Sequence, residues 1–167
     1  MMPIFLIGYM GSGKSTIGRN LSAMMNLNFI DLDEIIEAEL GMTINKIFSC
    51  KGEVFFREKE HSILTQFDFG QNLIVAVGGG TPCFFGNHDF MNSIGITIYL
   101  KVSCGELFNR LHSNTNRPLL LNNRLTLQDV ITTQMMKREK YYQTSQYIID
   151  SDNISVNQVY DLVNKII

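Results

Sequence analysis

The sequence carries near its beginning the run Gly8-Tyr9-Met10-Gly11-Ser12-Gly13-Lys14-Ser15, which fits the phosphate-binding pattern G-x-x-x-x-G-K-[ST]. A short apolar run suited to a buried strand precedes it, and residues 14–25 have the apolar spacing of a helix. Glycines let such a loop turn its N–H groups toward phosphate oxygens, and the start of the helix adds a positive dipole end. The sequence therefore predicts a nucleotide-binding loop. A glycine-rich turn that binds nothing is the alternative.

The polar residues of this run have separable roles. Lys14 offers a point charge to the β- and γ-phosphates, and the Ser15 hydroxyl offers a ligand to Mg²⁺. We expect the nucleotide to be bound by Gly11, Ser12, Gly13, Lys14, Ser15 and Thr16.

Strand and helix signals alternate along the whole chain, which is typical of an α/β protein whose parallel sheet is covered on both faces. The expected strands are 3–7, 28–32, 72–77, 95–100 and 146–149. The expected helices lie near 14–25, 33–40, 43–49, 53–67, 103–111, 126–143 and 155–166. With 167 residues and no linker-like stretch, residues 1–167 are predicted to form a single domain.

The amino-acid composition limits the classes of function that this protein is expected to have. A formal net charge of −2 argues against a dedicated nucleic-acid binder, which normally carries a basic surplus. The three cysteines are odd in number and lack a C-x-x-C pair, so they read as reduced thiols of a cytosolic protein. The histidines show no metal-binding spacing, and neither a signal peptide nor a membrane span is expected. A small-molecule partner fits best.

Two carboxylates follow the second expected strand, in Asp31-Leu32-Asp33. If the segment is extended, both point to one side, at the edge of the sheet where the phosphates lie. One carboxylate can then face the metal and the other a substrate hydroxyl. The alternative is that Asp33 only caps the helix that follows.

Several ordered motifs together resemble those of shikimate kinases: Gly8–Thr16, Asp31-Leu32-Asp33, Gly41-Met42-Thr43-Ile44-Asn45-Lys46-Ile47-Phe48 and Gly52-Glu53-Val54-Phe55-Phe56-Arg57-Glu58-Lys59-Glu60. The resemblance extends to the C-terminal helix. It implies a P-loop, nucleoside-monophosphate-kinase-like fold with three α/β/α layers and a five-stranded parallel sheet. It also implies ATP and Mg²⁺ as cofactors and transfer of the γ-phosphoryl group to the 3-hydroxyl of shikimate.

The resemblance assigns roles to residues whose spacing alone leaves alternatives open. Arg57 has Glu53 and Glu60 one turn away on either side, so it could be a substrate-gripping guanidinium or part of a solvated ion-pair ladder. The family pattern favours a substrate-carboxylate ligand within the substrate-binding helices, near 33–67. Asp31 would bind the metal ion through a water molecule, together with Ser15.

Three glycines follow the third strand, where many P-loop proteins have an aspartate. Gly79 and Gly80 are expected to approach the substrate with their backbone, although a tight structural turn is the alternative. Asp33 is the expected group that orients or deprotonates the acceptor hydroxyl.

Further arginines complete the predicted site. A polar, aperiodic stretch near 112–124 reads as a mobile lid, and Arg117 within it matches the family's lid arginine. Arg110 matches an arginine that stacks on adenine, although a surface residue near a helix end is the alternative. Arg138 lies on the continuation of an apolar helix stripe, where a charge needs a partner such as an anionic substrate. The resemblance makes it a second carboxylate ligand.

One departure from the family concerns the segment 150–155, which lacks the proline that many relatives place against the adenine ring.

Lys14, Asp33 and Arg117 are the expected catalytic residues of a cytoplasmic, monomeric shikimate kinase. Two rivals remain: another small-metabolite or nucleotide kinase of the same fold, and a nucleotide-dependent regulatory binder without turnover.

Overall fold

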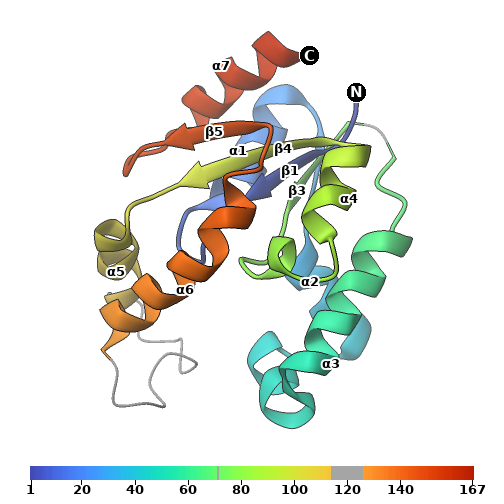
Figure 1. Cartoon of the computed structure of the whole chain (residues 1–167). Helices are drawn as coiled ribbons and strands as arrows, with labels where there is room; N and C mark the ends of the chain where they lie inside the picture. The colour runs from blue at the N-terminus through green and yellow to red at the C-terminus, as the bar shows by residue number, and fades with distance from the viewer. Residues whose placement is uncertain (71, 114–125) are drawn as a thin grey trace.

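A five-stranded, wholly parallel sheet organises the molecule, with helices on both of its faces (Figure 1). The computed structural model describes residues 1–70, 72–113 and 126–167. The strands are β1 Ile4–Ile7, β2 Asn28–Asp31, β3 Leu73–Ala76, β4 Ile96–Lys101 and β5 Tyr147–Asp150, in the order β2-β3-β1-β4-β5. The helices are α1 Lys14–Met25, α2 Leu32–Leu40, α3 Ile44–Gln66, the 3₁₀ turn η1 Thr81–Cys83, α4 Asn87–Ile94, α5 Cys104–His112, α6 Leu127–Tyr142 and α7 Val156–Ile166. The predicted α/β class with five parallel strands is confirmed.

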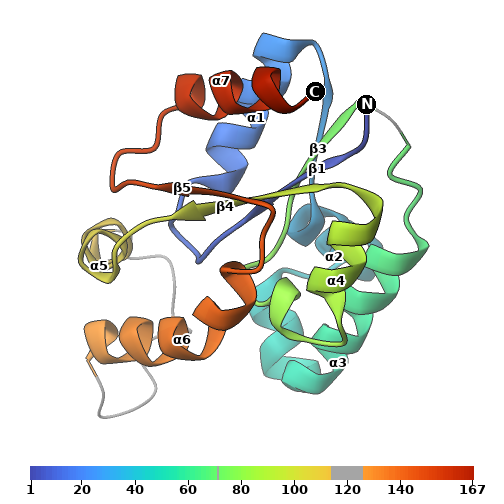
Figure 2. The ribbon, with the colours of Figure 1, turned by 45° about the horizontal axis from the view of Figure 1, so that its top comes forward.

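Side-chain alternation along the strands creates two separate apolar cores. In β1, Ile4 and Leu6 pack with α1 and α7, whereas Phe5 and Ile7 belong to the core on the other side of the sheet. Figure 2 shows α1 and α7 together on one face, with α2, α3, α4 and α6 on the other. Because both faces are covered, β1, β3 and most of β4 are apolar and buried throughout.

The strand register brings the functional loops to one edge of the sheet. Leu6 pairs with Ala76 and Asp31 pairs with the same residue, so β1, β2 and β3 end at nearly the same level. The residues that follow these strands are therefore neighbours, as expected at the carboxyl edge of a parallel sheet.

The observed elements differ from the sequence-based expectation in three places. No helix was expected between the third and fourth strands, but η1 and α4 lie there; α4 has only eight residues, too few for a clear apolar period. The expected helices 43–49 and 53–67 run together as α3 across a kink at Gly52. The extended geometry expected for 31–33 is wrong, because α2 begins at Leu32 and Asp31 is its N-cap.

No helix among the described residues is long and apolar enough to cross a membrane.

Candidate active site

The loop between β1 and α1 has the backbone that its glycines permit. Gly11 and Gly13 have φ values of 84° and 96°, a region that residues with a Cβ rarely adopt. The Lys14 side chain folds back over the loop, where its Nζ donates to the carbonyls of Gly8 at 2.8 Å and Tyr9 at 2.9 Å. The loop thus holds its lysine ammonium next to the start of α1, where the backbone N–H groups of a helix are unpaired.

A cavity of about 360 Å³ opens beside this loop. The predicted nucleotide ligands Gly11, Gly13, Lys14, Ser15, Thr16 and Arg110 all line it, as do Asp31 and Asp33. Ser12 is different: its backbone N–H donates to the Tyr9 carbonyl within the loop, and its buried hydroxyl has no hydrogen-bond partner among the described residues. The structure therefore brings every predicted nucleotide ligand in its described part to the cavity except Ser12.

Ser15 and Asp31 form the predicted metal-side pair. The Ser15 hydroxyl donates to Asp31 Oδ2 at 2.6 Å, while Asp31 Oδ1 accepts from the backbone N–H of Asp33 at 3.1 Å. Asp31, and not Asp33, is thus the residue that caps α2. Asp33 occupies the first turn of the helix, and both carboxylates reach the same cavity although the segment is not extended.

The surroundings of Asp33 favour its protonated form. Burial is the largest cause, the negative charges of Asp31 and Glu60 add to it, and together they raise the pKa of Asp33 from 3.8 to about 6. Lys14 and Arg57 act in the opposite direction. A carboxyl group with a pKa near neutrality suits a group that receives a proton.

A second cavity, of about 290 Å³, adjoins the first. The two cavities share Met10, Asp33, Gly78 and Gly79 in their walls. The second cavity also contains Arg57 from α3 and Arg138 from α6, together with the apolar residues Ile44, Phe48 and Phe56. A phosphorylated ligand in the first cavity and a small anionic ligand in the second would therefore meet beside Asp33.

Arg57 is held rigidly by its own helix and its neighbours. Its Nη1 donates to Glu60 at 2.8 Å and its Nε to Glu53 at 3.3 Å, and the guanidinium lies 4.6 Å from the centre of the Phe84 ring. Arg57 is only 7% exposed and Glu60 is fully buried. The ion pairs that the spacing allowed therefore form, but Arg57 and Glu60 are buried and only Glu53 is exposed to solvent.

Two of the three glycines after β3 leave space for the arginines. A Cβ on Gly80 would collide with the Arg57 guanidinium, and one on Gly79 would lie 3.4 Å from Arg138 Nη1. Gly79 also approaches the phosphate-binding loop, since its Cβ would lie 3.2 Å from the backbone nitrogen of Met10. At these glycines the close approach is that of arginine side chains and of the phosphate-binding loop, and the expected approach of their backbone to the substrate stays a prediction.

Arg138 lies on the inward face of α6, in line with the buried residues Ile131, Met135 and Tyr142. Within the described part of the chain, its guanidinium makes no ion pair with a carboxylate. It lies over the Tyr9 ring at 5.2 Å from the ring centre. A cation that lines a cavity without a carboxylate partner is suited to an anionic ligand.

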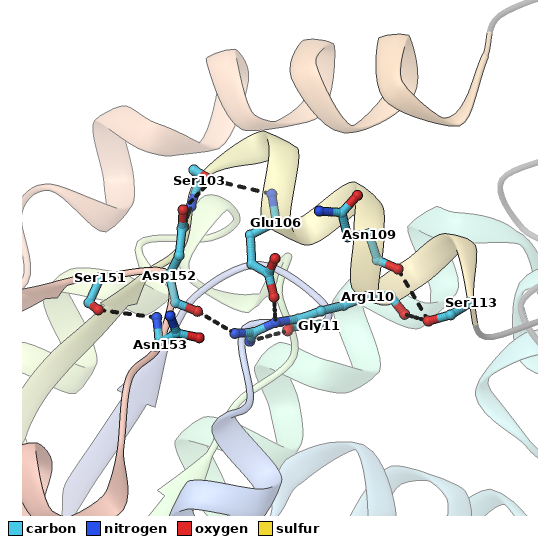
Figure 3. A network of polar contacts seen from close by, with 9 residues as sticks. All are labelled: Gly11, Ser103, Glu106, Asn109, Arg110, Ser113, Ser151, Asp152 and Asn153. Carbon is cyan, nitrogen blue, oxygen red and sulfur yellow. Dashed lines mark hydrogen bonds and ion pairs between the residues drawn. The ribbon is translucent and has the colours of Figure 1, made fainter.

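Arg110 connects the phosphate-binding loop to the segment before α7 (Figure 3). It donates to Glu106 at 2.7 Å, to the Gly11 carbonyl at 3.1 Å and to the Asp152 carbonyl at 2.5 Å. The Asp152 carboxylate is in turn bonded to the backbone and hydroxyl of Ser103 at the start of α5. Arg110 also lines the first cavity, so it is more than a solvated residue at a helix end.

Some residues of the site were not predicted from the sequence, and one predicted site residue lies outside the described part of the chain. Glu60 was recognised only as a ladder partner, although it binds both Arg57 and the hydroxyl of Thr81. Tyr9 and Gln134 were not assigned a site role. Arg117 and most of the expected lid, 112–124, lie outside the described residues.

Fold and site together define a protein of the P-loop kinase class, with two adjoining cavities at the carboxyl edge of its sheet. The comparisons with known proteins specify which one. The family model described as "SKI: Shikimate kinase" matches residues 10–167. The shikimate kinase of Flavobacterium psychrophilum is 40% identical over 171 aligned residues, covering 100% of this chain and 99% of that protein.

Solved structures agree with this family. The crystal structure of shikimate kinase from Bacteroides thetaiotaomicron has a TM-score of 0.87 at 34% identity and covers 98% of both chains. Shikimate kinase from Acinetobacter baumannii, in complex with shikimate, has a TM-score of 0.89 at 29% identity, over 99% of this chain and 92% of that one. The chain belongs to the shikimate kinase family. It is an enzyme of the shikimate pathway with shikimate kinase activity, and this family membership implies the use of ATP.

Proposed function

We propose that the enzyme transfers the γ-phosphoryl group of ATP directly to the 3-hydroxyl of shikimate, giving shikimate 3-phosphate, and that the two adjoining cavities hold donor and acceptor. The observation that carries the proposal is their shared wall at Met10, Asp33, Gly78 and Gly79, with two arginines in the acceptor cavity. That a relative was solved with shikimate bound supports the choice of acceptor.

On the donor side, the loop binds phosphates through its backbone N–H groups, Lys14 and the N-terminus of α1. The side chains of Ser15 and Asp31 fit Mg²⁺, since both present oxygen atoms, which this ion prefers. Within the described residues, no group of three or more histidine, cysteine or acidic side chains could enclose an ion. Ser15 would bind the ion together with Asp31, which would act through a water molecule. When bound, Mg²⁺ would supply positive charge that offsets the negative charge developing on the phosphoryl group.

On the acceptor side, Asp33 accepts a hydrogen bond from the attacking hydroxyl and takes its proton as the new O–P bond forms and the bond from the γ-phosphorus to the leaving ADP oxygen breaks. Arg57 and Arg138 bind the acceptor carboxylate, Arg57 with a guanidinium already fixed by Glu53 and Glu60. The backbone of Gly79 and Gly80 approaches the acceptor between them. Positioning and electrostatic stabilisation therefore supply most of the catalysis.

Two further arginines are assigned to the ATP-binding side of the site. Arg110 lines the first cavity and is proposed to contact the adenine side of ATP. The segment 150–155 takes part in this wall through the Asp152 carbonyl. Arg117 is proposed from the sequence to reach the transferring phosphoryl group from the lid near 112–124, where its charge would act in the transition state.

We further propose that residues 1–167 act as one domain and as a monomer in the cytoplasm. The three cysteines are free in the structure, which is consistent with a reducing compartment.

An acceptor panel tests the proposed reaction. Purified enzyme with ATP and Mg²⁺ is given shikimate, a nucleoside monophosphate, gluconate, or the shikimate analogue with an alcohol in place of the carboxylate. ADP release is followed and the product is identified by NMR. We expect efficient turnover only with shikimate and phosphate on its 3-oxygen. Faster phosphorylation of any other acceptor, or phosphate on another oxygen, would overturn the assignment.

A further inference from the structure

Tyr9, a residue of the phosphate-binding loop, contacts α6, the helix that carries Arg138. Its side chain is 1% exposed, and its hydroxyl donates to Gln134 Oε1 at 2.8 Å. One turn further along α6, the Arg138 guanidinium lies over the face of the same ring, 5.2 Å from its centre. The backbone of Tyr9 meanwhile accepts a hydrogen bond from Lys14 Nζ at 2.9 Å. One residue thus contacts both the donor-side lysine and the acceptor-side arginine.

The two arginines of the acceptor cavity are supported in different ways. Arg57 gives N–H donors to Glu53 and Glu60, so part of its hydrogen-bonding capacity is already used. Arg138, among the described residues, has no carboxylate partner and rests on an aromatic face. An aromatic ring attracts a guanidinium through its π-electrons and leaves the N–H groups at the edge of the guanidinium plane available. The Tyr9 ring therefore supports Arg138 without using its N–H groups, one of which interacts with the Tyr142 hydroxyl.

The ring itself is held from both sides. Tyr9 belongs to the apolar core beneath the sheet, and burial raises the pKa of its phenol, which stays protonated at neutral pH and can donate to Gln134. Gly79 completes the arrangement, since a Cβ there would meet Met10 of the loop at 3.2 Å and Arg138 at 3.4 Å. A shift of the loop would therefore move the surface on which Arg138 rests.

We infer that Tyr9 is a positioning residue for the acceptor carboxylate: its ring holds Arg138 in the binding orientation and links that orientation to the phosphate-binding loop. This inference rests on the proposed role of Arg138 in carboxylate binding. Tyr9 does not line either cavity, so it acts through the arginine and does not touch the substrate.

A fluorination series at position 9 tests the ring separately from packing. The full-length enzyme carries phenylalanine, 4-fluoro-, 3,5-difluoro- or 3,4,5-trifluorophenylalanine at this position, so the hydroxyl is absent throughout while ring size changes little. Fluorine withdraws electron density from the ring face and weakens the attraction for a cation. Dissociation constants are measured by calorimetry for shikimate and for its analogue with an alcohol in place of the carboxylate.

We expect shikimate to bind progressively more weakly along the series. Full loss of the ring contribution corresponds to roughly 2- to 30-fold in affinity. The alcohol analogue should show no trend, because it does not use Arg138. A flat series for shikimate, or equal slopes for both ligands, overturns the inference.

Two controls separate the possible failures. Tyr99 is a matched site, because it is fully buried and its hydroxyl donates to Glu139 of the same helix at 2.8 Å; the same series there should affect both ligands equally or not at all. Arg138→Ala should abolish the preference for acid over alcohol. If it does so while the position-9 series is flat, only the inference fails. If the preference survives Arg138→Ala, the proposed role of Arg138 fails and the inference with it.

Discussion

At the scale of single residues, Asp33 gives the proposed reaction its pH dependence. Its pKa is raised to about 6, and it must be ionised to accept the proton of the acceptor hydroxyl. We predict that kcat/KM for shikimate falls about tenfold per pH unit below pH 6 and is level above it, as measured from pH 5 to 8 with Mg²⁺-ATP saturating. Asp33→Asn should lower kcat by roughly 10²- to 10⁴-fold and remove this pH dependence. An unshifted profile in the Asn variant would assign the titration to another group.

The raised pKa of Asp33 also makes the stability of the folded protein depend on pH. The folded state holds the Asp33 proton up to about pH 6, whereas the unfolded state releases it near 3.8. Asp33 therefore contributes stability below the lower value, and this contribution is lost as pH rises toward 6. We predict that the melting temperature of Asp33→Asn, relative to the wild type, increases between pH 4 and pH 7. A difference that is constant or decreases with pH would contradict the raised pKa.

At the scale of elements, the turn after β3 is shaped by the guanidinium that it receives. Gly80 has ordinary φ and ψ angles of −94° and −19°, so alanine would cause no backbone strain there. Its Cβ would nevertheless collide with the Arg57 side chain. We predict that Gly80→Ala raises the KM for shikimate roughly tenfold or more, because it displaces a charge-assisted ligand.

Gly86 provides the control for this prediction. Its φ of +70° strains any residue with a Cβ, but no heavy atom lies within 4 Å of the position of that Cβ. Gly86→Ala should therefore lower the melting temperature while leaving the KM for shikimate unchanged. Equal effects of the two substitutions on KM would mean that Gly80 is needed only for a turn.

Asp31, at the start of α2, caps the helix and is also proposed to act on the metal ion. Asparagine caps helices about as well as aspartate, so Asp31→Asn should preserve α2 while it removes the charge near Ser15. We predict that the half-saturating Mg²⁺ concentration rises about 10- to 100-fold, the usual effect of changing a partner that acts on a metal indirectly. Glu34→Gln, on the exposed side of the same first turn, should leave it unchanged. Unaltered Mg²⁺ dependence in Asp31→Asn would remove Asp31 from the metal side.

At the scale of the whole molecule, the sequence predicted the features that depend on neighbouring residues, and it did not predict contacts between distant elements. The phosphate-binding loop and the parallel sheet follow from glycine spacing and alternating apolar runs, and the structure confirms their bounds to within two residues. The geometry of Asp31-Leu32-Asp33 was wrong because capping of α2 overrides extension of the strand. The burial of Glu60 and the contact of Tyr9 with α6 were missed, because both depend on elements distant in the sequence.

The central claim is that one carboxylate is bound by two arginines that line the same cavity, one from α3 and one from α6, two helices that Figure 1 shows apart from each other. The most direct measurement is a double-mutant cycle of shikimate binding, by calorimetry, with Arg57→Lys, Arg138→Ala and the double variant. Each single change should weaken binding by roughly 1–3 kcal/mol, and the double variant should lose clearly less than their sum, since both side chains contact one group. Strictly additive losses, or an alcohol analogue that responds to the substitutions as shikimate does, would contradict the claim.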